Sequence, residues 1–464
     1  MMSAPAMAKE LRHWPRLAAL SLAMLLPSLG TSITNVALPT LATSFGATMA
    51  DVQWVVIVYL LAVTSLIVGA GRLGDLVGRR RLLLTGMGLF SAASAICALS
   101  PGLPILISAR AVQGVGGAVM MTLTVAMVGD IVPKDRTGST MGLLGTVSAV
   151  GTALGPTLGG ALISAWGWPS VFAVLAATGL AAILAGGALF PPDVKAARSS
   201  TRFDLRGLAL LAISLGAFSA VFTLGGRMSG LALLGLSVVS AFGFLAFFRT
   251  EARAQAPLVR LDLLRDCTLG TGLASLMLVS AIVMATLVVG PFYLSGVLGL
   301  NPVGTGVVMS IGPAVAAVTG VPAGRLVDRT GPFPVIVGGL LAVMLGALLL
   351  TVLPGPFGAG GYAASLVVLT FGYAMFQAAN MTAIMQTTAS ENRGVTSALV
   401  GLARNMGLIW GASAMAAVYA MGPRIAGVIG FGAGTGTGLM ATFTLSAGLA
   451  GLALAAAFWV NRRA

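Results

Sequence analysis

Few side chains in this sequence of 464 residues could carry acid–base, nucleophilic or metal chemistry. The only histidine is His13, near the N-terminus, and the two cysteines, Cys97 and Cys267, lie far apart without metal or redox spacing. The sequence also lacks a Gly-x-x-x-x-Gly-Lys loop, the pattern that holds the phosphates of ATP. We therefore expect no enzyme active site, no cofactor and no metal site.

Polar residues inside long apolar runs are better candidates, because such residues are costly in a membrane and mark functional sites. Arg110 has Gln113 and Gly114 one helical turn along on the same face. The ordinary interpretation is that the side chain extends to the membrane surface, where its charge is solvated. We favour a functional role instead. The remaining polar residues that could face a cavity are Asn35, Gln377, Asn380, Gln386, Arg404 and Asn405.

Two short charged segments, 71–81 and 324–332, share the frame Gly-Arg-Leu-x-Asp with a Gly three residues after the Asp. A motif repeated in this way indicates a chain built from two related halves. Such a segment is either a topology signal alone or a conformational latch, and the shared Gly and Asp positions favour the latch. Its predicted residues are Gly71, Asp75, Gly78, Arg79 and Arg80 in the first half, and Gly324, Asp328 and Gly331 in the second.

The composition is that of an integral membrane protein. The chain is 57% hydrophobic and 8% charged, with a mean hydropathy of +1.00, whereas soluble domains are about 25% charged. A net charge of +14 could suggest nucleic acid. The cations lie in short segments between apolar runs, however, so we expect a lipid bilayer and no nucleic-acid partner.

Fourteen apolar runs are long enough to cross a bilayer, which takes roughly 20 residues of helix. They are 17–38, 54–70, 82–99, 106–128, 141–162, 171–189, 208–224, 231–248, 269–294, 303–322, 335–353, 363–385, 398–419 and 439–460.

The positions of the Lys and Arg residues agree with this number of spans. With both termini inside, 22 of the 26 Lys and Arg residues fall in inside segments, and only Arg227 and Arg424 fall outside. Arg110 and Arg404 lie within spans. This asymmetry predicts a cell-membrane protein with both termini cytoplasmic.

The repeated motifs follow the second and tenth spans. If spans seven and eight are an insertion between two halves of six spans, each motif follows the second span of its half. We therefore predict an all-α membrane fold with an N-terminal six-helix bundle (1–190), a linker with the two inserted spans (191–266) and a C-terminal six-helix bundle (267–464).

Small residues mark one face of the fifth span. Gly151, Gly155 and Gly159 are spaced by four, which permits close helix packing, while Pro156 bends the helix next to Gly160. Ordinary Gly-xxx-Gly packing would account for the spacing. A kink within a glycine seam is the more specific interpretation.

Taken together, these motifs resemble the major facilitator superfamily, and within it the fourteen-span drug:proton antiporter branch. Segment 71–81 resembles the loop motif after span two, with Leu76 in place of the usual basic residue. Segment 110–114 resembles the span-four motif, whose Arg is associated with proton transfer. Segment 151–160 resembles the antiporter motif typical of exporters. Segments 35–39 and 53–56, with Tyr59, resemble branch patterns in spans one and two.

This resemblance implies two six-helix bundles around a central cavity that opens alternately to each side, and a proton-coupled exporter of drugs or metabolites. An importer or facilitator of the same fold is the alternative, and a membrane-embedded lipid-modifying enzyme is less favoured. The expected partners are a small-molecule substrate and protons, and the expected state is a monomer.

One departure concerns coupling. The branch has an acidic residue five positions before the Asn of 35–39, and here that position is Gly30. No acid lies deep in a span, which argues against cationic drugs and favours neutral or anionic amphiphiles. We expect coupling through Arg110 with either Asp51 or the charge of the substrate, although Asp51 could simply cap the helix near Trp54.

Overall fold

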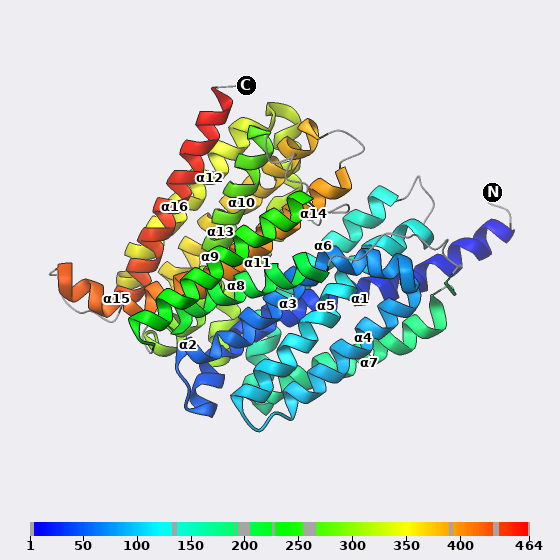
Figure 1. Cartoon of the computed structure of the whole chain (residues 1–464), viewed down its shortest axis with the longest axis horizontal. Helices are drawn as coiled ribbons and strands as arrows, with labels where there is room; N and C mark the ends of the chain where they lie inside the picture. The colour runs from blue at the N-terminus through cyan, green and yellow to red at the C-terminus, as the bar shows by residue number, and fades with distance from the viewer. Residues whose placement is uncertain are drawn as a thin grey trace.

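The computed structural model describes residues 4–131, 137–190, 192–193, 205–224, 228–253, 266–388, 393–429 and 436–462. Over these residues the chain forms helices joined by short turns (Figure 1). Thirteen helices of the described part are long and apolar enough to cross a membrane. The predicted all-α membrane fold is therefore confirmed.

The helices follow the predicted spans closely. They are α1 (Ala4–Phe45), α2 (Met49–Val52), α3 (Trp54–Val77), α4 (Arg79–Ala98), α5 (Leu103–Ile131), α6 (Thr137–Trp166), α7 (Pro169–Leu189), α8 (Leu205–Leu224), α9 (Gly230–Arg253), α10 (Cys267–Gly296), α11 (Pro302–Thr330), α12 (Pro332–Val352), α13 (Pro354–Thr387), α14 (Arg393–Trp410), η4 (Gly411–Met415), α15 (Ala416–Ile429) and α16 (Thr437–Asn461).

Local chemistry explains several boundaries. Proline is the first residue of α7, α11, α12 and α13, where its missing N–H costs nothing because that donor has no partner within the helix. Asp266 begins α10 by accepting hydrogen bonds from the amides of Thr268 and Leu269, at 2.8 and 3.1 Å. Asn301 begins α11 in the same way through the amide of Gly304, at 2.7 Å.

The predicted span that is not among these thirteen helices, 398–419, corresponds to the helical stretch α14–η4–α15. Its middle turn, Gly411–Met415, is π-helical. Just before that turn, the Trp410 ring stacks on Phe218 of α8, with ring centroids 5.0 Å apart. A π-helical turn inside a longer helix is frequently found at functional sites.

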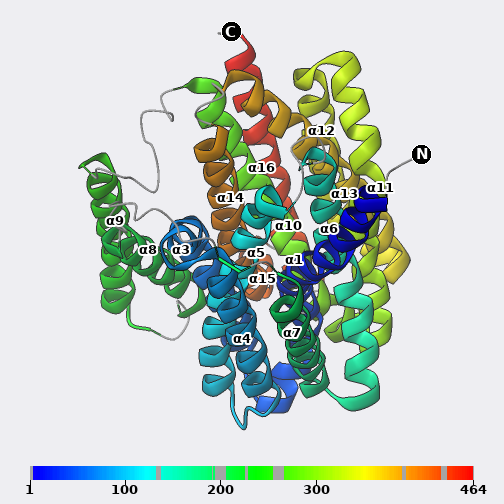
Figure 2. The same cartoon turned by 90° about the vertical axis from the view of Figure 1, so that its right-hand side faces the viewer.

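The helices form two bundles with an added pair. Helices α1 and α3–α7 pack together, as do α10–α14 with α16. Helix α9 packs on α8, and α8 contacts α3 of the first bundle and η4 of the second. Figure 2 shows this pair at the side of the molecule. Both ends of the predicted linker region 191–266, before α8 and after α9, lie largely outside the described residues, so the domain limits stay a prediction.

The two bundles meet along α6 and α11. Near one end of this contact, Gly160 faces the backbone of Pro302, and Gly306 faces the backbone of Pro156. Figure 1 shows the bundles diverging towards the side where both termini lie, away from α2 and α15. The molecule is thus closed at the α2 end and spread at the other.

Candidate functional site

Arg110 lies inside the first bundle and is fully buried. Its Nε donates to the carbonyl of Val55 on α3 at 2.9 Å, and one terminal nitrogen, Nη1, lies 3.5 Å from the carbonyl of Gly30 on α1. Nη1 also donates to Oε1 of Gln113. One side chain on α5 therefore holds three helices together.

Aromatic rings and an amide complete this network. The guanidinium carbon lies 4.2 Å from the ring centroid of Tyr59 and 6.0 Å from that of Phe172, which is a cation–π arrangement. Gln113 in turn donates to the hydroxyl of Ser94 on α4 at 2.6 Å. Nη2 of Arg110 is buried without a hydrogen-bond partner among the described residues.

Gly30 stands where the resembling branch has an acid, and its surroundings explain what the glycine does here. A Cβ at this position would meet Phe90 at 3.3 Å and Leu175 at 3.6 Å, both apolar side chains. Its carbonyl, in contrast, faces Arg110. A neutral backbone acceptor therefore lies beside the guanidinium, and this acceptor does not titrate.

Asp51 acts as a helix cap. Its carboxylate accepts from the amide of Thr48 at 3.0 Å and from the hydroxyl of Thr48 at 2.7 Å. Together with Thr48 it forms the capping box of α2. The capped helix is α2 and not α3, which begins at Trp54, so Asp51 has a capping role one helix earlier than the sequence suggested.

The glycine seam of α6 has two sides. Gly151, Gly155 and Gly159 face α1, where added Cβ atoms would collide with Leu25, Ser32 and Ile33. Gly160 and the carbonyl of Pro156 face α11 of the other bundle. The seam thus serves packing within one bundle and closure between the two.

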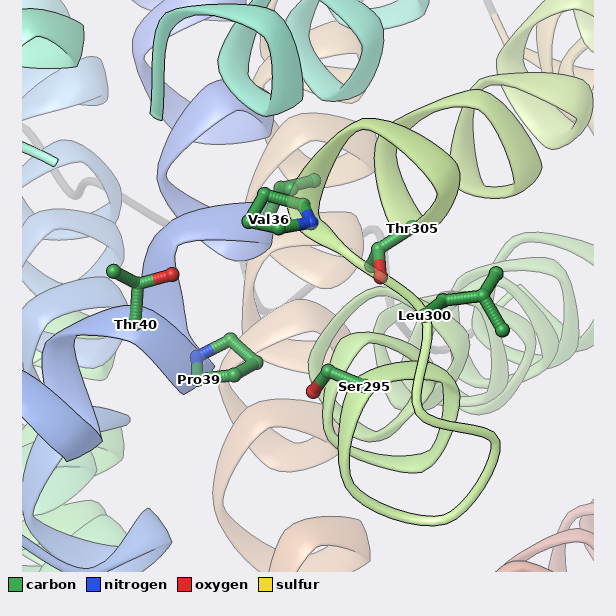
Figure 3. Close-up of a pocket in the computed structure, with 7 residues that line it drawn as sticks. Val36, Pro39, Thr40, Ser295, Leu300 and Thr305 are labelled. Carbon is green, nitrogen blue, oxygen red and sulfur yellow. The ribbon is translucent and has the colours of Figure 1, made fainter. Parts of the chain in front are cut away.

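The closed end holds a small pocket of about 30 Å³, enough for about one or two water molecules. Figure 3 shows Val36, Pro39 and Thr40 of α1 opposite Ser295 and Thr305 of the second bundle. Val36 and Pro39 belong to segment 35–39, so this branch-like pattern lies where the bundles meet.

A larger cavity of about 530 Å³ lies between the bundles. Ala149 of α6 lines one side, and residues of α10, α11, α13 and α14 line the other. Along α6 and α11 it lies past the Gly160–Pro302 contact, towards the ends that carry the motif segments 71–81 and 324–332. A cavity of this size can hold one drug-sized molecule.

Three of the predicted cavity residues line this cavity together, namely Gln377, Asn380 and Arg404. Asn380 also donates to the carbonyl of Gly272 at 3.0 Å, which ties α13 to α10. Asn405 and Gln386 are not among the lining residues, and Arg110 and Gln113 lie within the first bundle. Asn35 is buried, and neither atom of its amide has a hydrogen-bond partner among the described residues.

The first latch segment contains a contact that the sequence did not predict. Asp193, after α7, accepts from the backbone amides of Arg80 and Arg81 at 2.8 and 3.1 Å, and so caps α4. Gly78 has φ +106°, and a Cβ there would collide with Asp193. The Arg80 side chain donates to the carbonyl of Gly187 at 2.7 Å, so α4 is joined both to α7 and to the segment that follows it.

The other latch residues are less constrained or are not described. Arg79 donates to the carbonyl of Ala126 at 3.3 Å. In the second segment, Gly331 has φ +81°, whereas Gly324 has open space around it. The side chains of Asp75 and Arg424, and all of Arg227, lie outside the described residues, so the predictions on them stay predictions. No group of three His, Cys, Asp or Glu residues in the described part could hold a metal ion.

Comparison with known proteins identifies the family. The family model described as Major Facilitator Superfamily matches residues 20–412. The chain belongs to the major facilitator superfamily. It is therefore a multi-pass membrane transporter for a small-molecule substrate and not an enzyme.

Three similar proteins in the superfamily are named for different roles. The chain is 31% identical to the uncharacterized transporter YebQ of Escherichia coli, over 83% of this chain and 84% of the relative. It is 30% identical to the multidrug resistance protein Stp of Mycobacterium tuberculosis, over 87% and 75%. It is 26% identical to the riboflavin transporter RibZ of Clostridioides difficile, over 88% and 89%.

Solved structures agree on the fold. A crystal structure of the peptide transporter POT matches with a TM-score of 0.72 at 15% identity, over 96% of this chain and 95% of that one. A bacterial homologue of the lysosomal transporter Spinster matches with a TM-score of 0.69 at 16% identity, over 97% of both chains.

Proposed function

We propose that this chain is a secondary active exporter, which moves small amphiphilic compounds out across the cell membrane by alternating access. The single observation that carries the proposal is the cavity between the bundles, together with its closure at one end by α6 and α11. Alternating access requires this combination, because the substrate site must open to one side while the other is sealed.

Two observations bear on the direction of transport. The kinked glycine seam of α6 resembles the antiporter motif of exporters, and Stp, a relative at 30% identity, is named for multidrug resistance. RibZ, a relative at 26% identity, is named a riboflavin transporter and not a drug exporter. An importer or facilitator of the same fold is therefore the second candidate.

The proton-motive force is the proposed energy source. Of the two coupling routes that the sequence left open, the contacts favour the charge of the substrate over Asp51. Asp51 caps α2, and Arg110 is enclosed by neutral acceptors and aromatic rings. Guanidinium itself stays protonated in proteins, so Arg110 is not a proton carrier.

The orientation follows from the distribution of positive charge. We propose that the cavity faces the cytoplasm in this conformation and that the α6–α11 contact seals the outer side. Single cysteines at Arg79 and Arg462, on a background without Cys97 and Cys267, should resist an impermeant thiol reagent added to intact cells. A cysteine at Leu99 should react, and labelling at Arg79 would overturn this orientation.

Transport by the purified protein in liposomes tests the function. We expect a panel of amphiphilic compounds to move against their gradients when a pH difference and a membrane potential are imposed. A paired Thr157→Cys and Ser310→Cys variant provides the control, because these two hydroxyls are hydrogen-bonded between α6 and α11. Oxidation should stop transport and reduction should restore it. Unchanged transport in the cross-linked protein would contradict alternating access.

A further inference from the structure

The cavity between the bundles has one charged group among its described lining residues, the guanidinium of Arg404. Arg404 lies six residues after the start of the predicted span 398–419, which places it about 9 Å along the helix axis. This depth is about a third of the roughly 30 Å hydrocarbon core of a bilayer. A cation so far along a span is costly unless it has a partner or serves the transport pathway.

No protein partner for this charge appears in the described part of the chain. None of the described lining residues is acidic, and no described carboxylate forms an ion pair with Arg404. The side chain is exposed to the cavity region rather than buried among acceptors, in contrast to Arg110. Arg404 is therefore free to pair with a ligand, whereas Arg110 is already held.

The rest of the wall suits the body of an amphiphile. Leu276, Met381 and Val400 provide apolar contact, and Gln377 and Asn380 provide neutral polar groups. The other described lining residues are small, so the cavity has room for an aromatic ring system.

Charge then separates the substrate classes. A cationic compound would meet the like charge of Arg404 without any described acid to offset it. A neutral compound would not pair with the guanidinium, whose charge would then be solvated only by water that remains in the cavity. An anionic compound would pair with it through charge-assisted hydrogen bonds, which the planar guanidinium can make in pairs to a carboxylate or sulfonate.

We propose that this cavity selects amphiphiles with a single negative charge, with the anionic group on Arg404 and the apolar body against α10 and α13. This inference rests on the proposed function in one respect, because it assumes that the cavity is the transport pathway. It restricts the amphiphilic substrates of the proposed function to those with one negative charge.

Binding of two matched dyes to the purified full chain tests the inference without requiring transport. Fluorescein methyl ester is singly anionic at neutral pH, and the corresponding rhodamine methyl ester has the same shape and is cationic. Fluorescence anisotropy should give a dissociation constant about 10-fold or more lower for the anionic dye, as expected for a hydrogen bond between charged groups.

Three variants of cavity residues and one control variant assign the preference to the cavity. Arg404→Gln should remove most of the difference between the dyes, and Arg404→Lys should retain part of it. Gln377→Glu adds an acid to the same wall and should shift binding towards the cationic dye. Arg462→Gln removes one exposed charge at the end of α16, away from the cavity, and should change neither constant.

The outcomes are separable from those of the transport assay. Tighter binding of the cationic dye, an unchanged ratio in Arg404→Gln, or no binding of either dye to the folded protein would each overturn the inference. Anion-selective binding without any movement in liposomes would instead refute the exporter and leave the ligand class standing.

Discussion

At the scale of single residues, the geometry of Arg110 decides what a substitution there should do. Its fork reaches acceptors on α1, α3 and α5 at once, namely the carbonyls of Gly30 and Val55 and the Gln113 amide. Lysine has the same charge but carries one nitrogen at the end of its chain and cannot reproduce this arrangement. The side chain therefore acts as a tether between helices as much as a charge.

We expect Arg110→Lys to lower transport at least about tenfold, because buried acceptors that lose their donor cost about 1–3 kcal/mol each. Thermal unfolding in detergent should fall with it. Arg462→Lys is the matched control, because Arg462 is exposed at the end of α16 and is not among the residues that line the cavity. Wild-type transport by Arg110→Lys would show that only the charge matters.

The cap of α4 by Asp193 gives a second prediction. Asp193→Ala should destabilise the start of α4 by about 0.5–2 kcal/mol, and transport should fall because the first latch segment, 71–81, ends there. Asp193→Asn keeps one acceptor for the backbone amides, so it should show a smaller effect. Asp328→Asn, at an exposed position in the second segment, is the comparison. Equal transport by all three variants at equal expression would remove Asp193 from the latch.

At the scale of the helices, the two sides of the α6 seam should respond differently to added volume. A Cβ at Gly306 of α11 would collide with the backbone of Pro156 across the bundle interface, whereas a Cβ at Gly338 of α12 meets nothing within 4 Å. Gly306→Ala should therefore weaken the closure without unfolding either bundle.

The reactivity of a cysteine at the closed end measures this weakening. A single cysteine at Ser295, beside the small pocket of the closed end, should react faster with a thiol reagent in the Gly306→Ala background. Gly338→Ala should leave the rate unchanged. Gly155→Ala should instead lower thermal stability, because Gly155 packs on Ser32 within one bundle. Equal labelling rates in the Gly306 and Gly338 variants would contradict the assignment of the seal.

The helices also show which parts of the structure a sequence can predict. Hydropathy gave the spans because each helix must satisfy its own backbone in lipid, which makes the signal local. The spacing of Gly151, Gly155 and Gly159 predicted a packing face for the same reason. The polar residues Gln377, Asn380 and Arg404 were visible because they interrupt apolar runs.

Other features depend on groups that carry no sequence signal. Backbone carbonyls are the partners of Arg110, and every residue has one. Asp193 lies 113 positions from the amide of Arg80 that it caps, and only the meeting of α4 and α7 brings them together. The π-helical turn at 411–415 and its contact with α8 depend on tertiary packing in the same way. For Asp193, the single acid shortly after α7 was the one signal available.

At the scale of the whole molecule, the arrangement of charge bears on the source of energy. The spread end of the bundles leads to a cavity whose described wall holds a cation and no acid. Gly30 lies where the resembling branch has an acid in the first span, and Asp51 serves as a cap. We therefore expect the charge that moves through the membrane field to be the charge of the substrate.

An anion that leaves a negative interior gains about 2.3 kcal/mol per 100 mV, which corresponds to about a 50-fold concentration ratio. We therefore expect a potassium diffusion potential, with equal pH on both sides, to drive fluorescein methyl ester through the protein in liposomes. Reversing the potential should reverse the direction of movement, and Arg404→Gln should abolish it. The cationic rhodamine ester should not move through the protein under either polarity. Transport that follows a pH difference and ignores the potential would require a titrating group in the pathway, and would refute coupling by the charge of the substrate.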